Sequence, residues 1–171
     1  MKLSPRYRMP FKRTRLGKTD YKRRLKLLKS RRLRLVVRRS LNYITAQIVE
    51  FDGKGDKIIL SSYSKQLKKI GWKFACDNIS AAYLTGLALG KQAAKSSIKE
   101  AILDSGLYSS TKGNRIYAVV KGAVDGGLNV PVEKEILPSN DRIIGKHIAV
   151  NDKFKELPSA FEKIRHIIEG G

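Results

Sequence analysis

Residues 33–63 read LRLVVRRSLNYITAQIVEFDGKGDKIILSSY, and this stretch decides the fold class. Leu33, Leu35 and Val37 occupy alternate positions of residues 33–39, the period-two pattern that predicts a strand with one buried face. Residues 43–51 and 57–63 predict two more strands, and the DGKGD sequence of residues 52–56 predicts the hairpin loop between them. The stretch therefore predicts a three-stranded antiparallel meander.

Downstream of the meander, the sequence predicts helices around one further strand. A Lys-rich helical turn follows Ser64 and ends at Gly71, and a long apolar helix begins after a cap at Asp77, Asn78 or Ser80. Residues 101–103, AIL, predict a short buried parallel strand, and residues 116–124 predict a helix with one apolar side that ends at a Gly-Gly pair. This order predicts an α/β sheet that begins as an antiparallel meander and continues through a crossover.

The two ends of the chain differ from this body. Residues 1–18 have no helical or strand period, and Pro5 and Pro10 favour extended backbone before them. Thr19 is a predicted N-cap, with Asp20 in the first turn of a short basic helix over residues 21–29. From Pro131 onward we expect a loose extension that ends in an amphipathic helix near residues 160–168. We therefore divide the chain into a basic arm with a short helix (1–31), an α/β body (32–130) and a C-terminal extension (131–171).

Positive charge is concentrated at the beginning of the chain. The 171 residues include 36 Lys and Arg against 15 Asp and Glu, and residues 1–40 hold 17 of the basic residues with Asp20 as their single acid. Such an arm repels itself and needs a polyanion to order it. Tyr7 and Phe11 are interleaved with these bases and have rings that stack on nucleobases. The composition predicts nucleic-acid binding, and it leaves DNA and RNA equally open.

Several classes of protein do not fit the sequence. A single cysteine, Cys76, excludes an intramolecular disulfide framework and a cysteine-based zinc site, and we interpret it as a passive buried thiol. The beginning of the chain lacks the apolar segment of a secretory signal. The longest apolar stretch, near residues 79–90, is too short to span a bilayer. We expect a soluble intracellular protein without a membrane partner.

Motifs for catalysis are absent or incomplete. The Gly17-Lys18-Thr19 sequence resembles the end of a phosphate-binding loop, but position 12, where that loop needs glycine, is a lysine. His147 and His166 have no partner at metal-ligand spacing and are interpreted as surface residues. The sequence predicts no catalytic residue, no metal site, no cofactor and no small-molecule substrate.

Two alternative functions remain beside RNA binding. A basic architectural DNA-binding protein has the same charge pattern. A ribonuclease-H-like nuclease has a meander and a crossover but needs several convergent acids for its metal ions. Here Asp52 and Asp56 are read as turn residues, and Asp104 is a lone acid at a strand end, which argues against the nuclease.

Two further features have two interpretations each. The loop Thr111-Lys112-Gly113-Asn114-Arg115, followed by Lys121, precedes a helix and is predicted to bind a phosphate; the alternative is an ordinary capped loop. Trp72 either stacks on a nucleobase or is a packing residue inside the protein.

Motifs along most of the chain resemble one known family. They are Pro5-Arg6-Tyr7-Arg8 with Pro10-Phe11 and Arg13, Gly17-Lys18-Thr19-Asp20-Tyr21, Leu35-Val36-Val37-Arg38 with Ser40 and Asn42-Tyr43-Ile44, Gly71-Trp72-Lys73, Ala81-Ala82-Tyr83-Leu84-Thr85-Gly86, Ala101-Ile102-Leu103-Asp104, Thr111-Lys112-Gly113 with Arg115, Lys121-Gly122-Ala123 with Asp125, and Glu135-Ile136-Leu137-Pro138. Together they resemble the archaeal and eukaryotic 5S-rRNA-binding proteins of the large ribosomal subunit, the family numbered eighteen in bacteria.

The resemblance implies a fold, a location and partners. The fold is a three-layer mixed α/β sheet of the translational-machinery-component type, with the ribonuclease-H-like motif but without its active site. The implied function is structural: binding 5S rRNA and attaching it to the large-subunit rRNA in the central protuberance of the cytoplasmic ribosome. The implied neighbours are ribosomal proteins of the large subunit, including the other 5S-binding protein.

The implied RNA-binding residues come from three segments. They are Arg6, Tyr7, Arg8, Phe11, Lys12, Arg13, Arg15, Lys18, Thr19, Tyr21, Lys22, Arg23, Arg24, Lys26 and Lys29 in the arm and basic helix; Arg38, Arg39, Ser40, Asn42 and Tyr43 at the end of the first strand; and Lys112, Gly113, Asn114, Arg115 and Lys121 around the second loop.

Overall fold

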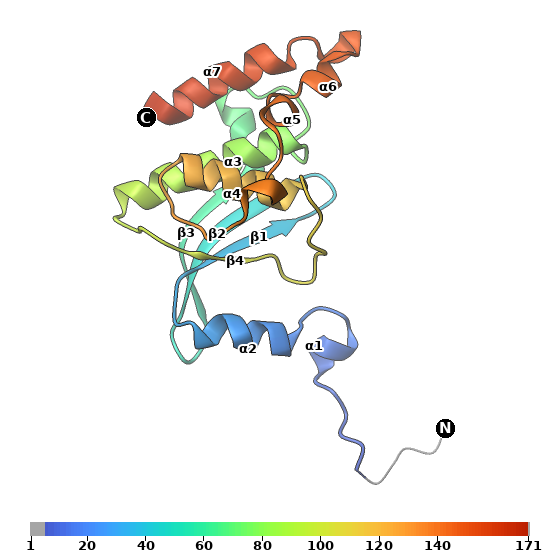
Figure 1. Cartoon of the computed structure of the whole chain (residues 1–171), viewed down its shortest axis with the longest axis vertical. Coiled ribbons are helices and arrows are strands. Elements are labelled where there is room, and N and C mark those ends of the chain that lie inside the picture. Colours follow the sequence, from blue (N-terminus) through green and yellow to red (C-terminus); the bar gives the residue numbers. More distant parts are fainter. Residues whose placement is uncertain (1–5, 171) are drawn as a thin grey trace.

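The computed structural model describes residues 6–170 and has a mixed α/β architecture (Figure 1). Its sheet has the strand order β3-β2-β1-β4, with the bounds β1 (Arg34–Arg39), β2 (Ile44–Phe51), β3 (Asp56–Tyr63) and β4 (Ile102–Asp104). Strand β2 pairs antiparallel with both β1 and β3, whereas β4 pairs parallel with β1. The predicted meander and the predicted parallel strand after a crossover are both confirmed.

Two helices cover one face of the sheet, as Figure 1 shows: α3 (Ile79–Lys95) and α4 (Arg115–Asp125). Asn78 caps α3 and Asn114 caps α4, because each side chain accepts a hydrogen bond from a backbone N–H of the first turn. A 3-10 helix, η1 (Ser64–Ile70), connects β3 to α3 and ends at Gly71, whose φ of 101° suits glycine. Leu35, Val37 and Ile48 are fully buried in the core between the sheet and these helices.

Helices α3 and α4 pack against each other through glycines. A Cβ atom placed on Gly86 of α3 would overlap the carbonyl oxygen of Val119 in α4, and one placed on Gly122 of α4 would overlap the carbonyl oxygen of Tyr83 in α3. The two backbones are therefore in direct contact, and no larger side chain fits at either position without moving one helix.

The C-terminal residues are not a loose extension. They form η2 (Lys134–Ile136), α5 (Asn140–Ile144), α6 (Lys146–Ala149), η3 (Asp152–Phe154) and α7 (Leu157–Gly170). Leu157, Phe161 and Ile164 of α7 are buried in the same core as α3, and the rings of Phe161 and Tyr83 lie 5.6 Å apart. The predicted amphipathic helix near residues 160–168 is confirmed as part of α7. The expectation of a loose segment is wrong, because the apolar residues of α7 recur at helical spacing and cover the outer side of α3.

The N-terminal segment lies on the other side of the sheet from α3 and α4, below it in Figure 1. It contains α1 (Lys12–Arg15), a helical turn that the sequence did not predict, and α2 (Tyr21–Lys29), which it did. The N-cap of α2 is Asp20 rather than Thr19, because the Asp20 carboxylate accepts the backbone N–H of Arg23. Pro5 and the rest of residues 1–5 lie outside the described residues. No helix within residues 6–170 has the length and hydrophobicity that crossing a membrane requires.

Candidate nucleic-acid interface

The predicted arm and basic helix present most of their cations to solvent. In the arm the exposed predicted residues are Arg6, Tyr7, Arg8, Phe11, Lys12, Arg13, Arg15 and Lys18, and in α2 they are Tyr21, Lys22, Arg23, Lys26 and Lys29. Phe11 and Tyr21 hold the arm beside α2 with ring centroids 5.3 Å apart. A cationic surface with exposed aromatic rings is thus built from a local segment of the chain.

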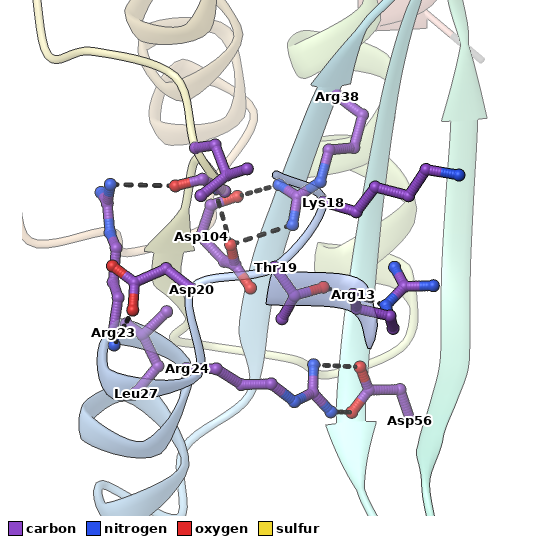
Figure 2. A pocket seen from close by; sticks show the side chains of 12 residues that line it. Arg13, Lys18, Thr19, Asp20, Arg23, Arg24, Leu27, Arg38, Asp56 and Asp104 are labelled. Atoms are coloured by element: carbon purple, nitrogen blue, oxygen red, sulfur yellow. Dashed lines mark hydrogen bonds and ion pairs between the residues drawn. The ribbon is translucent and has the colours of Figure 1, made fainter. Parts of the chain in front are cut away.

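Helix α2 has two faces with different partners. Lys22, Lys26 and Lys29 recur at i, i+4 and i+7, so they lie along one side of the helix, and we call them the lysine stripe. Within residues 6–170 the stripe makes no ion pair, and all three side chains are exposed. Arg23 and Arg24 point instead toward the sheet (Figure 2). The helix thus uses arginine for contacts inside the protein and leaves lysine for solvent.

A cleft of about 260 Å³ separates α2 from the sheet, and Figure 2 shows its lining. Its basic side chains are Arg13, Lys18, Arg23, Arg24 and Arg38, its acidic ones are Asp20, Asp56 and Asp104, and the other lining residues are Thr19, Leu27, Gly106 and Leu107. Thr19 accepts a hydrogen bond of 3.0 Å from Nε of Arg13, which fixes the turn before α2. The cleft therefore joins the arm, α2 and the strand ends in one polar surface.

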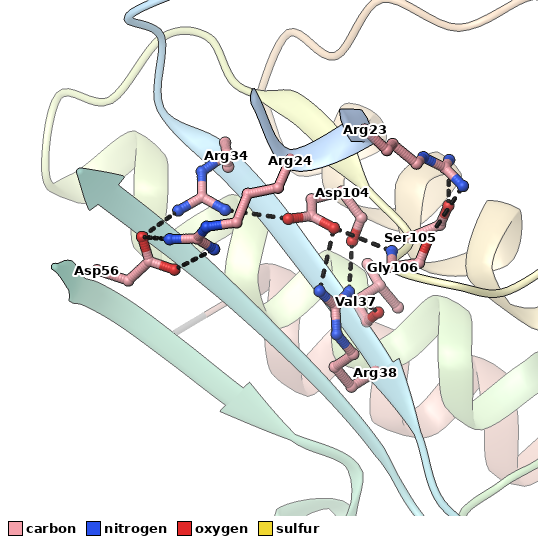
Figure 3. A network of polar contacts seen from close by, with 9 residues as sticks. All are labelled: Arg23, Arg24, Arg34, Val37, Arg38, Asp56, Asp104, Ser105 and Gly106. Carbon is pink, nitrogen blue, oxygen red and sulfur yellow. Dashed lines mark hydrogen bonds and ion pairs between the residues drawn. The ribbon is translucent and has the colours of Figure 1, made fainter. Parts of the chain in front are cut away.

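A buried arginine connects the two sides of this cleft. Arg34 of β1 is only 1% exposed, and its guanidinium donates to Asp104 at 3.0 Å and to Asp56 at 2.6 Å (Figure 3). A buried charge is tolerated when it is paired and hydrogen-bonded, and two carboxylates satisfy this one. Asp56 was predicted to be a turn residue, but it is the first residue of β3. Asp104 was predicted to be a lone acid, but it binds both Arg34 and Arg38.

Arg24 and Arg23 extend this network from α2. Arg24 forms a two-pronged pair with Asp56, with N–O distances of 2.9 and 2.7 Å. Arg23 donates to the carbonyl of Gly106 at 2.9 Å and to the hydroxyl of Ser105 at 2.8 Å. Planar guanidinium groups suit such two-pronged contacts. Both arginines were predicted to bind RNA, yet the structure gives them intramolecular partners.

Arg38 closes the network at the other end of Asp104. Its guanidinium donates to one carboxylate oxygen of Asp104 at 3.0 Å and to the backbone carbonyl of the same residue at 2.7 Å. The Arg38 side chain is 43% exposed, so part of it still faces solvent. The backbone N–H of Gly106 also donates to Asp104.

The arginines change the acidity of both carboxyl groups. The hydrogen bond from Arg24, aided by Arg34, lowers the pKa of Asp56 below its ordinary value despite partial burial. Burial of Asp104 opposes ionisation, but Arg38, the Gly106 N–H and Arg34 outweigh it, so its pKa is lowered as well. Both groups are therefore ionised at neutral pH, and the network carries full charges.

These pKa shifts predict acid-labile stability. Because the folded-state pKa values lie below the unfolded ones, the network's contribution is fully present above the ordinary Asp pKa near 3.8 and is lost as pH falls through the folded values. We expect the free energy of unfolding to decrease below about pH 4. In urea titrations, the stability difference between wild type and Asp104→Asn should shrink over the same range, since protonation removes the charge that the variant lacks. A difference that stays constant down to low pH would contradict this origin.

The predicted contacts after the first strand lie on the tip of the β1–β2 hairpin. The backbone N–H and the hydroxyl of Ser40 both donate to the Tyr43 carbonyl, and the Tyr43 N–H donates to the Ser40 hydroxyl. Asn42 is exposed. Arg39 lies over the ring of Tyr108 at 5.1 Å, and the Tyr108 hydroxyl donates to the Arg39 carbonyl. The tip is thus a hydrogen-bonded, cationic turn.

The second predicted loop has a different character. Arg115 binds the Asp77 side chain at 2.7 Å, and Lys121 donates to the Pro138 carbonyl and the Asn140 side chain. The Gly113 N–H donates to the Ile136 carbonyl, and Asn114 caps the helix. Lys112 is 75% exposed, with Glu135 at 3.7 Å. The capped-loop interpretation describes this geometry, because the expected phosphate donors are largely engaged within the chain.

The remaining residues singled out in the sequence have structural roles or none. Trp72 is buried and its indole N–H donates to the Ala75 carbonyl, which favours the packing interpretation. Cys76 is buried, and burial raises the pKa of its thiol. His147 and His166 are exposed. Among residues 6–170, no three His, Cys, Asp or Glu side chains gather as a metal site would require.

Comparison with known proteins gives consistent matches. A model of the family described as ribosomal large subunit proteins 60S L5 and 50S L18 matches residues 5–100 and 92–133. Large ribosomal subunit protein uL18 of Methanococcus maripaludis is 46% identical over 164 residues, covering 95% of this chain and 85% of that protein. The protein of the same name from Korarchaeum cryptofilum is 52% identical over 149 residues, covering 87% of this chain and 76% of that protein. The matched residues include the arm, α2, the sheet and α4.

Proposed function

The chain belongs to the L18/L5 family of large ribosomal subunit proteins, and from this premise we propose that it binds 5S rRNA and helps attach it to the large-subunit rRNA in the central protuberance. Membership makes the protein a structural component of the ribosome rather than an enzyme. It also supports assigning the body to the translational-machinery type of ribonuclease-H-like fold, with the other 5S-binding protein as a neighbour.

One observation carries the proposal: the outward cations of the arm and α2. Within residues 6–170, the side chains of Arg8, Lys12, Arg15, Lys18 and the lysine stripe make no ion pair with the protein. So many cations on one segment repel one another and attract a polyanion. Phosphates are the natural partners of this surface, because each phosphate contact releases condensed counterions.

The other predicted residues have different roles in this proposal. Arg39, Ser40, Asn42 and Tyr43 form a hydrogen-bonded tip that reads the shape of the RNA. Five other predicted residues have hydrogen-bond partners in the protein: Arg23, Arg24, Arg38, Arg115 and Lys121. They shape the surface, and only the solvent-exposed parts of their side chains contact the RNA. Lys112 is exposed, and in this proposal it exchanges its 3.7 Å ion pair with Glu135 for a phosphate contact.

Competition at matched salt tests the function. The purified protein is titrated with labelled 5S rRNA in the presence of unlabelled 5S rRNA, an unrelated RNA hairpin or duplex DNA. We expect only 5S rRNA to compete at low excess, because backbone contacts add affinity while shape and base contacts select the partner. Equal competition by duplex DNA would favour the architectural DNA-binding alternative, and equal competition by the hairpin would reject 5S specificity.

A further inference from the structure

Helix α2 has no fully buried apolar anchor of the kind by which surface helices usually dock. None of its nine residues is fully buried, and Leu25 is 55% exposed. Leu27 and Leu28 are partly buried. Apolar burial therefore supplies only part of what holds α2 in place, and polar side-chain contacts to the rest of the chain have to supply the remainder.

The arginine contacts of α2 reach two separate parts of the sheet. Arg24 binds Asp56 at the beginning of β3, 32 residues away, and Arg23 binds Ser105 and Gly106 just after β4, more than 80 residues away (Figure 3). Two attachment points on opposite sides of β1 fix both the position and the rotation of the helix. Rotation matters because the lysine stripe lies on the opposite side of α2 from Arg24 and about a quarter turn from Arg23.

We propose that Asp56 is a positioning residue for RNA binding: through Arg24 and Arg34 it holds α2 on the sheet and aims the lysine stripe at the RNA before the RNA arrives. The proposal rests on the proposed function and extends it to a residue whose own charge repels RNA. A carboxylate in a polyanion-binding surface opposes binding by simple electrostatics. Its contribution here comes from preorganisation, which reduces the ordering cost that binding has to offset.

Asp56→Ala distinguishes these two effects because they have opposite signs. If charge alone matters, removing the carboxylate tightens binding. If Asp56 positions α2, binding weakens: a drop in the docked fraction to about one tenth weakens the apparent affinity about tenfold. Arg34 keeps its ion pair with Asp104 in this variant, so the buried guanidinium is not left without a counter-charge and the body stays folded.

Three further variants provide controls. Asp52→Ala removes the same charge from the same hairpin, at an exposed residue whose side chain has no partner within residues 6–170, and should leave affinity unchanged or higher. Asp56→Glu keeps the carboxylate and should restore most of the affinity. Lys26→Gln removes a charge from the stripe and should reduce the salt slope by about 0.7 to 0.9, whereas Asp56→Ala should lower the affinity at every salt concentration without changing the slope.

Hydrogen exchange of the RNA-free protein provides a readout independent of RNA. We expect amides of the second half of α2 to exchange at least about tenfold faster in Asp56→Ala than in wild type, with α3 unchanged. Unchanged exchange, or binding as tight as that of wild type, would overturn the proposal. If wild type does not bind 5S rRNA, the proposed function fails, and the exchange measurement still decides whether Asp56 holds α2.

Discussion

Gly122→Ala is expected to destabilise the protein by about 3 kcal/mol, although the same substitution usually stabilises a helix by about 1 kcal/mol. The sign reverses because a Cβ atom on Gly122 would overlap the backbone of Tyr83 and Leu87 in α3. Backbone atoms within a helix cannot turn aside as a side chain can, so α3 and α4 have to separate. In thermal unfolding, a loss of this size lowers Tm by roughly 6 to 12 °C for a chain of this length.

Gly55→Ala is the matched control for this prediction. Gly55 lies in the β2–β3 hairpin, where an added Cβ would meet no atom within 4 Å. We expect its Tm to stay within about 2 °C of wild type. A Gly122→Ala protein that melts at or above the wild-type temperature would show that the two helices have room to separate, and that the glycine contact is not needed for stability.

Much of the sheet could be predicted because it follows from local patterns. Alternation over residues 33–39 and the glycine-containing loop at 52–56 involve neighbours in sequence, and these define β1, β2 and β3. The amphipathic helix α7 was predicted, but its packing on the body was missed, although Leu157, Phe161 and Ile164 recur at i, i+4 and i+7. That spacing predicts a buried helical face. The prolines nearby favoured a loose segment, and only tertiary packing shows which surface the face covers.

The ion-pair network could not be predicted from the sequence. It depends on the parallel register that places Val36 beside Asp104, and a parallel register is set by the crossover helix rather than by residues of either strand. Arg34 and Arg38 are four residues apart, so they lie on the same face of β1, the one that faces away from α3 and α4. This spacing predicts a polar face but does not identify the residues that the arginines bind. In a strongly cationic segment every arginine resembles a ligand for phosphate. The structure separates those with a carboxylate partner from those without one.

Deletion of residues 1–31 is expected to weaken 5S rRNA binding by on the order of a thousandfold at about 0.15 M salt, and to flatten its salt dependence more than any substitution in the body. This segment holds 13 of the 36 basic residues and one of the 15 acidic ones. If the arm and lysine stripe contact about six phosphates, the log–log salt slope becomes shallower by about four to five. The fold should survive, because no residue of α1 or α2 is buried and Arg34 retains Asp104 and Asp56 as partners.

Salt titrations of full-length and truncated protein measure this effect, with 5S rRNA and an unrelated hairpin as ligands and a thermal melt to verify folding. Part of the preference for 5S rRNA should remain after truncation if, as we propose, the tip from Arg38 to Tyr43 on the sheet reads the shape of the RNA and the arm adds affinity through backbone contacts that select no sequence. Equal slopes for the two proteins would contradict the electrostatic role of the arm. Complete loss of the preference in a folded truncated protein would instead place recognition in the arm and α2, where the orientation set by Asp56 would then decide which RNA is bound.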